Sequence, residues 1–439
     1  MIVTPRPDDP MDRRAFRIWF AVIVAGSAVL RLVYVVAAKR GEAVVGDQIY
    51  YSAQAVTIAN GRWFADPFVE GAYAADHAPL TSLLLAPVSW SDDNPFLAQR
   101  LLMACFGVAV VIGIGVLARW LFGRRVALVA AFLAAIYANL WINDGLLMSE
   151  TFAAAGVVAV LVTVYVYDLR RTMRWAVAIG LALGLAGLAR AELLLLGPLV
   201  VVPLALTDRD GAPWSVRVRQ LVAAGAVSLL VIAPWVIRNL VRFEDTTIVS
   251  TQDGLTLLGA NCPDTYTGPG KGFWSLQCTE RVEVPAGADQ SERSTIYRET
   301  AIDYIGDHLG EVPGVVLARL GRGLSVWQTD GMRFLNTGEG RETWASDVAL
   351  WQYWILAPLA VVGWWRWPSA QPRWPALVTA GLSLVTIMAF YGIVRFRIPA
   401  EVVIVLGAAV TVQWAGQAVA DRFRSRRSGT PRRAGLPAS

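Results

Sequence analysis

The chain has 439 residues, of which 55% are hydrophobic and only 17% are charged, and its formal net charge is +5. A soluble protein of this length needs more charge to cover its surface, so the composition excludes an ordinary soluble domain and indicates an integral membrane protein. The basic residues form short clusters between apolar runs. That pattern is typical of membrane topology and not of a nucleic-acid-binding face, so the lipid bilayer is a predicted partner and nucleic acid is not.

The apolar runs predict a multi-pass bundle of about ten transmembrane helices, since about 20 apolar residues cross the hydrocarbon layer. The first run, 18–38, is longer than the apolar part of a signal peptide and predicts an uncleaved helix. The later runs are 96–121, 126–143, 147–167, 175–189, 193–206, 218–240, 349–364, 376–391 and 398–418. The fifth and sixth spans are short, which leaves a tilted or re-entrant arrangement open.

Two long polar segments interrupt these runs, within what is predicted to be a single transmembrane domain over 1–439. The first loop, 39–94, contains one apolar patch, 80–88, that is too short to span and predicts a helix at the membrane surface. The large loop covers 241–347. The basic tail, 419–439, is rich in Arg, Ser, Gly and Pro, and we expect it to be disordered in the cytoplasm near anionic lipid.

The basic clusters also predict the topology. With the N-terminus in the cytoplasm, every predicted cytoplasmic segment is basic, as the positive-inside rule requires. Lys39 and Arg40 are the exceptions, because they fall on the other face. Both long loops then lie outside the cytoplasm. The use of Arg in place of Lys indicates a GC-rich bacterial genome, and hence the bacterial inner membrane.

This topology places a set of unusual polar residues at the outer ends of helices. Charges so close to hydrocarbon are costly, so they pair, line a wet cavity or serve a function. Their gathering on one face predicts a single extracytoplasmic site. Arg31, deep in the first span, is the exception. The residues are Asp47, His77, Glu150, Arg190, Glu192, Arg238, Arg395 and Arg397.

Asp47 lies a few residues after the first span and is followed by Tyr50 and Tyr51. A carboxylate at the membrane surface can accept the proton of an acceptor hydroxyl as a donor sugar departs. It can equally act as the N-cap of a helix over 48–60. From position alone, the two interpretations are evenly balanced.

From the first helix to the His77–Leu80 segment, the chain resembles the GT-C superfamily of polyprenyl-phosphate-sugar glycosyltransferases. The resemblance is to the branch of the protein O-mannosyltransferases and lipid A aminoarabinose transferases. Asp47 falls on the catalytic Asp of that branch. Gln48 replaces the common following Glu, and Ala78 replaces the first Pro of a basic-Pro-Pro-Leu motif. A second, adjacent carboxylate therefore has no counterpart here.

Further segments resemble family motifs and follow one another in the family's order. Ser149-Glu150 is similar to the pair that opens the fourth span, and Arg190-Ala191-Glu192 to an Arg-Pro-Glu turn. The order of these motifs along one chain, more than any single one, carries the resemblance. The remaining similar segments are 234–239, 250–254, 259–261 and 391–399.

The resemblance implies an all-α, GT-C-type membrane bundle with two large extracytoplasmic loops. It implies an inverting glycosyltransferase (hexosyl or pentosyl) that takes its sugar from a polyprenyl-phosphate donor, with Asp47 as general base. The acceptor is a hydroxyl of a protein, a lipid or a glycan. The departing phosphate needs positive charge nearby, and guanidinium groups pair with phosphate in a bidentate way. The candidates are Arg190, Arg395, Arg238 and Arg397.

Tyr50, His77, Glu150 and Glu192 are the predicted substrate-binding residues. Structural alternatives stay open for most of these positions: Arg238 and Arg397 could contact lipid headgroups, and the two glutamates could merely pair with arginines. No cofactor is predicted with certainty. A divalent metal ion stays open, although the chain has only two histidines and His77 is a weaker candidate for a ligand than for a hydrogen-bonding group.

Cys262 and Cys278 lie in the large loop, where an oxidising compartment would let them form a disulfide. Two unpaired thiols are the alternative. The rival function is a transporter or flippase of lipid-linked sugars. A carrier is expected to have ionisable residues near the middle of the bilayer and an internal repeat, and the sequence shows no such repeat.

Overall fold

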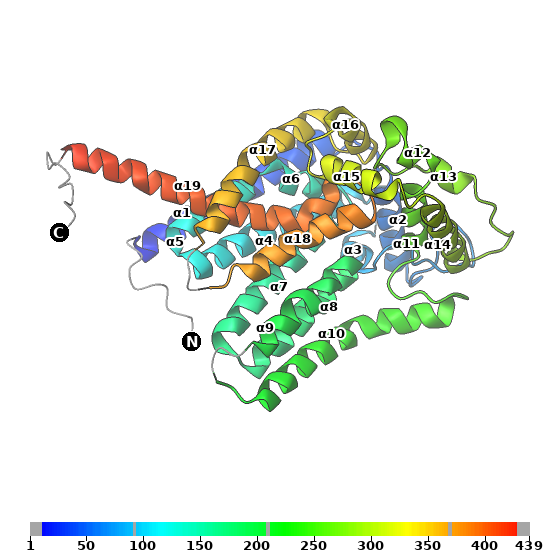
Figure 1. Ribbon diagram of the computed structural model, residues 1–439, viewed down its shortest axis with the longest axis horizontal. Helices are drawn as coiled ribbons and strands as arrows, with labels where there is room; N and C mark the ends of the chain where they lie inside the picture. Colours follow the sequence, from blue (N-terminus) through cyan, green and yellow to red (C-terminus); the bar gives the residue numbers. More distant parts are fainter. Residues whose placement is uncertain (1–10, 91–93, 208–210, 368–370, 428–439) are drawn as a thin grey trace.

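The computed structural model describes residues 11–90, 94–207, 211–367 and 371–427. Within these ranges the protein is helical, and the only extended pairing is an isolated bridge between Ala65 and Tyr73. Figure 1 shows a long bundle of helices that carries a group of shorter helices at one end. The all-α membrane architecture expected from the apolar runs is therefore confirmed.

In the part of the chain that the structure describes, six apolar helices are long enough to cross a membrane. Each overlaps a predicted run, because the thickness of the hydrocarbon layer fixes the length of the apolar stretch. The first continues into a wider turn over Val35–Lys39. They are α1 (Arg13–Tyr34), α4 (Phe96–Phe122), α7 (Glu150–Arg170), α10 (Trp214–Arg242), α17 (Thr343–Trp365) and α19 (Ile398–Arg427). The largest differences are at the start of α17, six residues before the predicted run, and at the end of α19, nine residues after it.

The other predicted spans are broken or short. Helix α5 (Arg124–Ile136) and the segment Ala138–Gly145, which begins with α6 (Ala138–Trp141), meet at a 58° bend and give at most a seventh span. Helices α8 (Met173–Ala189) and α18 (Trp374–Ala389) are shorter apolar helices, and so is the stretch Ala191–Leu206, which ends in α9 (Val202–Leu206). The count of ten stays a prediction, since it requires all three shorter segments to cross.

Helix α19 forms the centre of the bundle. It contacts α17, α18, α5 and α7. Its first three turns are buried, with Val402, Val403 and Val405 fully enclosed, whereas its last turns extend beyond the bundle. The start of α19 is therefore fixed by packing on several sides, and so is the short turn, η7 (Val394–Arg397), that precedes it.

The large loop folds into a helical unit, here called the polar lobe (residues 243–342). It lies at one end of the bundle beside α2 (Asp47–Ala59) and α3 (Leu80–Leu85), as Figure 1 shows. The predicted short helix at 80–88 is thus present as α3 and one further turn. The helices of the lobe are α11 (Gln252–Ala260), α12 (Pro263–Tyr266), α13 (Gln277–Glu280), α14 (Gln290–Asp307), α15 (Val312–Gly323) and α16 (Thr329–Gly338).

Two further expectations concern the polar lobe and the tail. A disulfide joins Cys262, just before α12, to Cys278 in α13, with 6.2 Å between their Cα atoms. The predicted disordered tail is wrong over its first part, because α19 continues through 419–427. The rest of that tail, 428–439, lies outside the described residues.

Candidate functional site

Arg395 holds three carboxylates at the polar end of the bundle. Its Nη2 donates to Asp47 Oδ2 at 2.7 Å, and its Nη1 donates to Glu339 Oε1 at 2.9 Å. Its Nε lies 2.8 Å from Glu150 Oε1. Each nitrogen of one planar guanidinium therefore faces a different acid, a geometry that the fork of Arg allows and the single ammonium of Lys does not. We call these four residues the Arg395 cluster.

Asp47 is placed by the first turn of α2. The N-cap is Gly46, whose φ of 57° suits glycine, and the N-cap side-chain hydrogen bond that was one interpretation of Asp47 is not formed. The capping interpretation is therefore wrong. The Asp47 side chain instead reaches across to Arg395 and keeps about a quarter of its surface exposed. Burial by itself raises the pKa of this carboxyl, but Arg395, together with the nearby His77 and Arg190, outweighs burial and lowers the pKa to about 2.

A second arginine extends the cluster. Arg190 lies in extended backbone between α8 and the next turn, and its Nη1 donates to Glu150 Oε1 at 3.1 Å. Its Nε donates to Glu192 Oε1 at 2.5 Å, and its guanidinium lies 5.2 Å from the ring centroid of Phe396. The Glu150 side chain, only 1% exposed, is thus shared between Arg190 and Arg395. Pairing of this kind is what makes a buried carboxylate tolerable.

His77 forms the aromatic side of the site. Its Nε2 is 3.7 Å from Asp47 Oδ1, and its ring stacks on Tyr51 and meets Tyr50 edge-on. Burial lowers the pKa of His77, although the Asp47 charge opposes this. The imidazole is therefore neutral at pH 7 and can donate or accept a hydrogen bond. Tyr51 was not among the predicted site residues.

Two of the four predicted phosphate-binding arginines lie outside the cluster. Arg238, near the end of α10, lies among aromatic rings that include Phe64 and Trp235, and donates to the Phe64 carbonyl at 2.7 Å. Arg397 donates from Nε to Glu401, one helical turn later, at 2.6 Å, and its guanidinium packs on Tyr353. Both side chains are thus held by protein partners.

A buried ion pair lies next to Glu150 of the cluster, and its acidic member, Asp144, was not singled out from the sequence. Arg31 pairs with Asp144 at 2.6 Å, and Asp144 accepts a hydrogen bond from Thr151 at 2.8 Å. The Asp144 carboxylate lies against Gly107, where a Cβ would be 1.9 Å from Oδ2, so only glycine fits. The isolated charge expected deep in the first span is therefore a paired one, held by α1, α4 and α7.

Among the residues that the structure describes, no three His, Cys, Asp or Glu side chains are placed to hold a metal ion. The carboxylates that do converge, those of the Arg395 cluster, already surround a guanidinium, and His77 faces only Asp47. The site residues as arranged do not fit a divalent cation, and no step is assigned to one.

Comparison with known proteins agrees with this architecture. Residues 76–237 match the family model of the dolichyl-phosphate-mannose-protein mannosyltransferases. The apo oligosaccharyltransferase of Archaeoglobus fulgidus superposes with a TM-score of 0.57 at 17% identity, over 98% of this chain and 54% of that one. The chain therefore shares the membrane fold of this oligosaccharyltransferase. No curated protein sequence is significantly similar to it.

Two other structures of the archaeal enzyme are similar in the same way. The complex of AglB from Archaeoglobus fulgidus with an inhibitory peptide and a dolichol-phosphate matches with a TM-score of 0.52 at 15% identity, over 96% of this chain and 53% of that one. The form tethered to an acceptor peptide matches with a TM-score of 0.55 at 16% identity, over 94% and 51%. The chain thus spans about half the length of those proteins, and the likeness establishes its fold.

Proposed function

We propose that this protein transfers a sugar from a polyprenyl-phosphate donor to an acceptor hydroxyl, with inversion, at the polar end of the bundle. The observation that carries the proposal is the environment of Asp47. Its carboxylate is ionised at neutral pH, one oxygen is fixed by Arg395, and the other faces His77 without a direct hydrogen bond to it. A general base needs this combination of an ionised, oriented and accessible oxygen.

In the proposed reaction, Asp47 Oδ1 accepts the proton of the acceptor hydroxyl. The hydroxyl oxygen bonds to the anomeric carbon of the donor sugar from the face opposite the phosphate. The bond from that carbon to the phosphate oxygen breaks, and its electron pair leaves with the polyprenyl phosphate. The products are the glycoside, the lipid phosphate and a protonated Asp47, which then releases its proton to water.

The contacts divide the two cluster arginines by role. Arg395 uses all three nitrogens on carboxylates, so we assign it to positioning Asp47 and keeping it ionised. Arg190 pairs through Nε and Nη1, and Nη2 takes no part in these two ion pairs. Arg190 is therefore the better candidate to bind the departing phosphate, with Glu150 and Glu192 fixing its orientation. In this role Arg190 would stabilise the negative charge that develops on the phosphate in the transition state.

His77 and Tyr50 form the aromatic wall beside Asp47 and are proposed to bind the acceptor or the donor sugar. We propose that the reaction takes place on the extracytoplasmic face of the bacterial inner membrane, because the basic clusters favour a cytoplasmic N-terminus.

This topology is tested by reporter fusions after Arg242 and after Arg366. The first fusion should report the extracytoplasmic side and the second the cytoplasm. The reverse pattern would contradict the placement.

The test of the activity is transfer from a panel of radiolabelled polyprenyl-phosphate sugars, in membranes that contain wild-type protein or Asp47→Asn. Asn keeps the size of Asp but cannot act as a base. The matched control is Asp253→Asn in α11, since Asp253 is a half-exposed surface residue paired with Arg298. Transfer by wild type and by the control, but not by an equally abundant Asp47→Asn, supports the proposal. Equal transfer by wild type, the control and Asp47→Asn would show that Asp47 is not the general base.

If no donor of the panel yields transfer, the transferase proposal fails, and the rival function, a carrier of lipid-linked sugars, is tested next. A carrier would change the side on which a labelled lipid-linked sugar is exposed in sealed vesicles. That measurement needs no acceptor, so the two functions are separated by experiment.

A further inference from the structure

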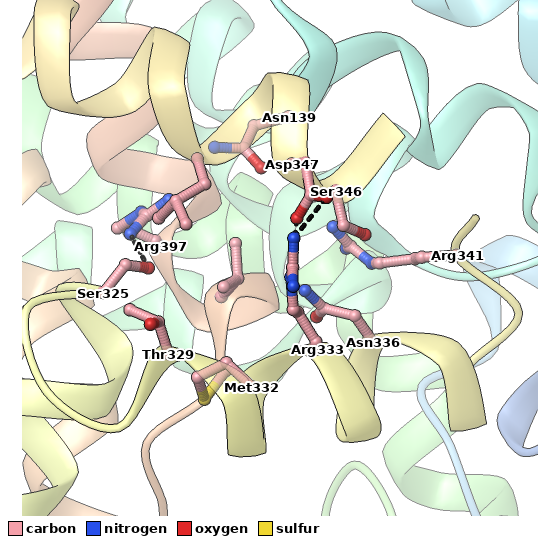
Figure 2. A pocket seen from close by; sticks show the side chains of 12 residues that line it. Asn139, Ser325, Thr329, Met332, Arg333, Asn336, Arg341, Ser346, Asp347 and Arg397 are labelled. Carbon is pink, nitrogen blue, oxygen red and sulfur yellow. Dashed lines mark hydrogen bonds and ion pairs between the residues drawn. The ribbon is translucent and has the colours of Figure 1, made fainter. Parts of the chain in front are cut away.

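A second polar pocket lies beside the Arg395 cluster and shares none of its residues. It lies between α16, the start of α17 and η7, and Figure 2 shows Arg333, Arg341 and Arg397 around it. Arg397 comes two residues after Arg395 on η7, so the same turn contributes one arginine to each place. Met332, Leu350 and Val394 supply apolar contacts to the lining.

The lining carries an excess of positive charge. Three arginines line it, whereas Asp347 is the acidic residue among the lining groups and is held by Arg333 Nε at 2.7 Å. Arg397 has a further acid partner, Glu401, that does not line the pocket. Arg341 also lies near Glu150 and Glu339, but those carboxylates are held by Arg395 and Arg190 and do not line the pocket. The lining itself therefore has three guanidinium groups and one carboxylate. A concave site with this balance attracts an anion.

Three lining groups lack a hydrogen-bond partner although they are buried. They are Asn336 Oδ1, Arg341 Nε and Ser346 Oγ, and their residues are 8%, 3% and 8% exposed. Buried polar atoms are nearly always hydrogen-bonded to protein or to ordered water, so three such atoms around one pocket make it suited to a polar ligand. Because the oxygen and nitrogen of an Asn amide are interchangeable in assignment, Asn336 can turn its NH2 group toward an anion.

We propose that this pocket is a second anion site and that it binds a phosphate group. A phosphate presents several acceptor oxygens in different directions, which matches donors arriving from α16, from the loop after it and from α17. The site is separate from the place assigned to the donor phosphate at Arg190. It therefore goes beyond the transfer reaction and gives the protein two anion-binding positions.

The setting of the pocket allows a lipid to supply that phosphate. Phe334 on α16 and Trp351 on α17 are strongly exposed, and so is Trp344 at the start of α17. Exposed tryptophans at one end of a spanning helix are typical of the interface between hydrocarbon and headgroups. Free phosphate has the same chemistry, so the experiment below distinguishes the two sources.

The experiment uses the full-length protein, purified in a neutral detergent without any sugar donor, and inorganic phosphate as the probe. Binding is measured by isothermal titration calorimetry for wild type and two isosteric variants of opposite sign. Asn336→Asp adds a negative charge to the pocket and should weaken binding about tenfold or more. Asp347→Asn removes a negative charge and should strengthen binding. Asp264→Asn, at the surface pair with Arg281, is the control and should leave it unchanged.

No binding of phosphate by wild type, or shifts of the same sign in both pocket variants, would overturn the proposal. The melting temperature of each variant, measured in parallel, shows whether it is folded. A binding measurement without donor sugar is independent of catalysis, so failure of the transfer reaction leaves this test intact.

The source is then distinguished with nanodiscs of phosphatidylcholine, with and without phosphatidic acid. If phosphatidic acid in the disc reduces the affinity for inorganic phosphate in wild type but not in Asn336→Asp, the occupant is a lipid phosphate. If it has no effect on wild type, the occupant is a soluble phosphate. Either result keeps the anion site and assigns its ligand.

Discussion

Arg395 Nη2 donates a hydrogen bond to Asp47 Oδ2 at 2.7 Å, although the two residues are 348 positions apart in the chain. Asp47 opens the first helix of the polar end, and Arg395 lies just before the last helix of the bundle. The proposed base is thus oriented from the opposite end of the sequence. Because Arg395 also holds Glu150 and Glu339, any change in it alters the placement of three carboxylates at once.

Replacing Arg395 with Lys should abolish most of the transfer activity while the protein still accumulates. Lys keeps the charge, but one ammonium cannot hold three separately placed carboxylates in the geometry of the fork. Losing two charge-assisted hydrogen bonds corresponds to about 3 kcal/mol, or about a 100-fold lower kcat/KM. Arg238→Lys, outside the cluster, is the matched control and should retain activity. An equal loss of kcat/KM in both variants would contradict the assignment of Arg395, and not Arg238, to the site.

The pH dependence of transfer should report the Arg395–Asp47 pair. The pKa of Asp47 is lowered to about 2, below its ordinary value of 3.8, so the base stays ionised and its rate should not fall between pH 8 and pH 5. The stabilising effect of this pair is present above pH 3.8 and is lost only as the pH falls through 2. In Arg395→Met, burial of Asp47 is unopposed by that charge and its pKa rises. The residual rate of this variant should therefore decrease toward pH 5, and a flat profile would contradict the assignment.

Asp76 should make the stability of the protein fall as the pH rises, which is opposite to the effect of the Arg395–Asp47 pair. Burial and the nearby Asp66 carboxylate raise the pKa of Asp76 to about 6. Between pH 3.8 and pH 6 the folded protein binds more protons than the unfolded chain, so this group lowers stability as the pH rises. Asp76→Asn removes the effect and should gain about 1–2 kcal/mol relative to wild type between pH 5 and pH 7.5. Melting temperatures at the two pH values measure it; a constant difference would contradict it.

The Arg31–Asp144 pair should be needed for stability more than for chemistry. Both side chains are almost fully buried and 2.6 Å apart, so removing one partner leaves an uncompensated charge. Arg31→Met or Asp144→Leu alone should cost about 3–5 kcal/mol, and the double variant should recover most of that loss. Thermal unfolding in detergent gives the comparison. A double variant as unstable as the sum of the single ones would show that the pair is not the source.

Reduction of the Cys262–Cys278 disulfide should loosen the polar lobe. The two cysteines are 16 positions apart, and closing a loop of this size contributes about 3 kcal/mol in the chain-entropy model. Cys262→Ser with Cys278→Ser should therefore lower the melting temperature and speed up proteolysis within 243–342. Cys105→Ser, at the cysteine that forms no disulfide, is the control. An unchanged digestion pattern would show that the lobe is held by its other contacts.

The spanning helices could be predicted from the sequence because the bilayer sets their length and composition. The 58° bend at Tyr137 could not, since neither Gly nor Pro marks it. The stretch Ala191–Leu206 is different: Pro198 and Pro203 lie inside it and account for its division into short turns. The folding of 243–342 into helices was also missed, because short polar helices have little apolar periodicity.

Part of the site could also be predicted from the sequence, because the predicted spans show which helix ends share one face of the membrane. Asp47, Glu150, Arg190 and Arg395 lie at ends of helices on one face, and the structure brings them together. Sequence position gives the face but not the direction of a side chain. It therefore left a lipid-headgroup alternative open for Arg238 and Arg397 but could not give the protein partners that hold them. Glu339 and Asp144 lie in segments without a recognisable motif, and only the folded chain places Glu339 in the cluster and Asp144 next to it.

The position of Arg395 near the end of the chain has a consequence for biosynthesis. The ribosome has made Asp47 long before its partner Arg395 is available, and until then Glu150 has Arg190 but not Arg395 as a partner. Until the last helix inserts, these acids have to remain hydrated, because unpaired charges are costly in a dry interior. A chain that terminates before Arg395 therefore cannot assemble the site, and the insertion machinery would release it with exposed acids that quality-control proteases can recognise.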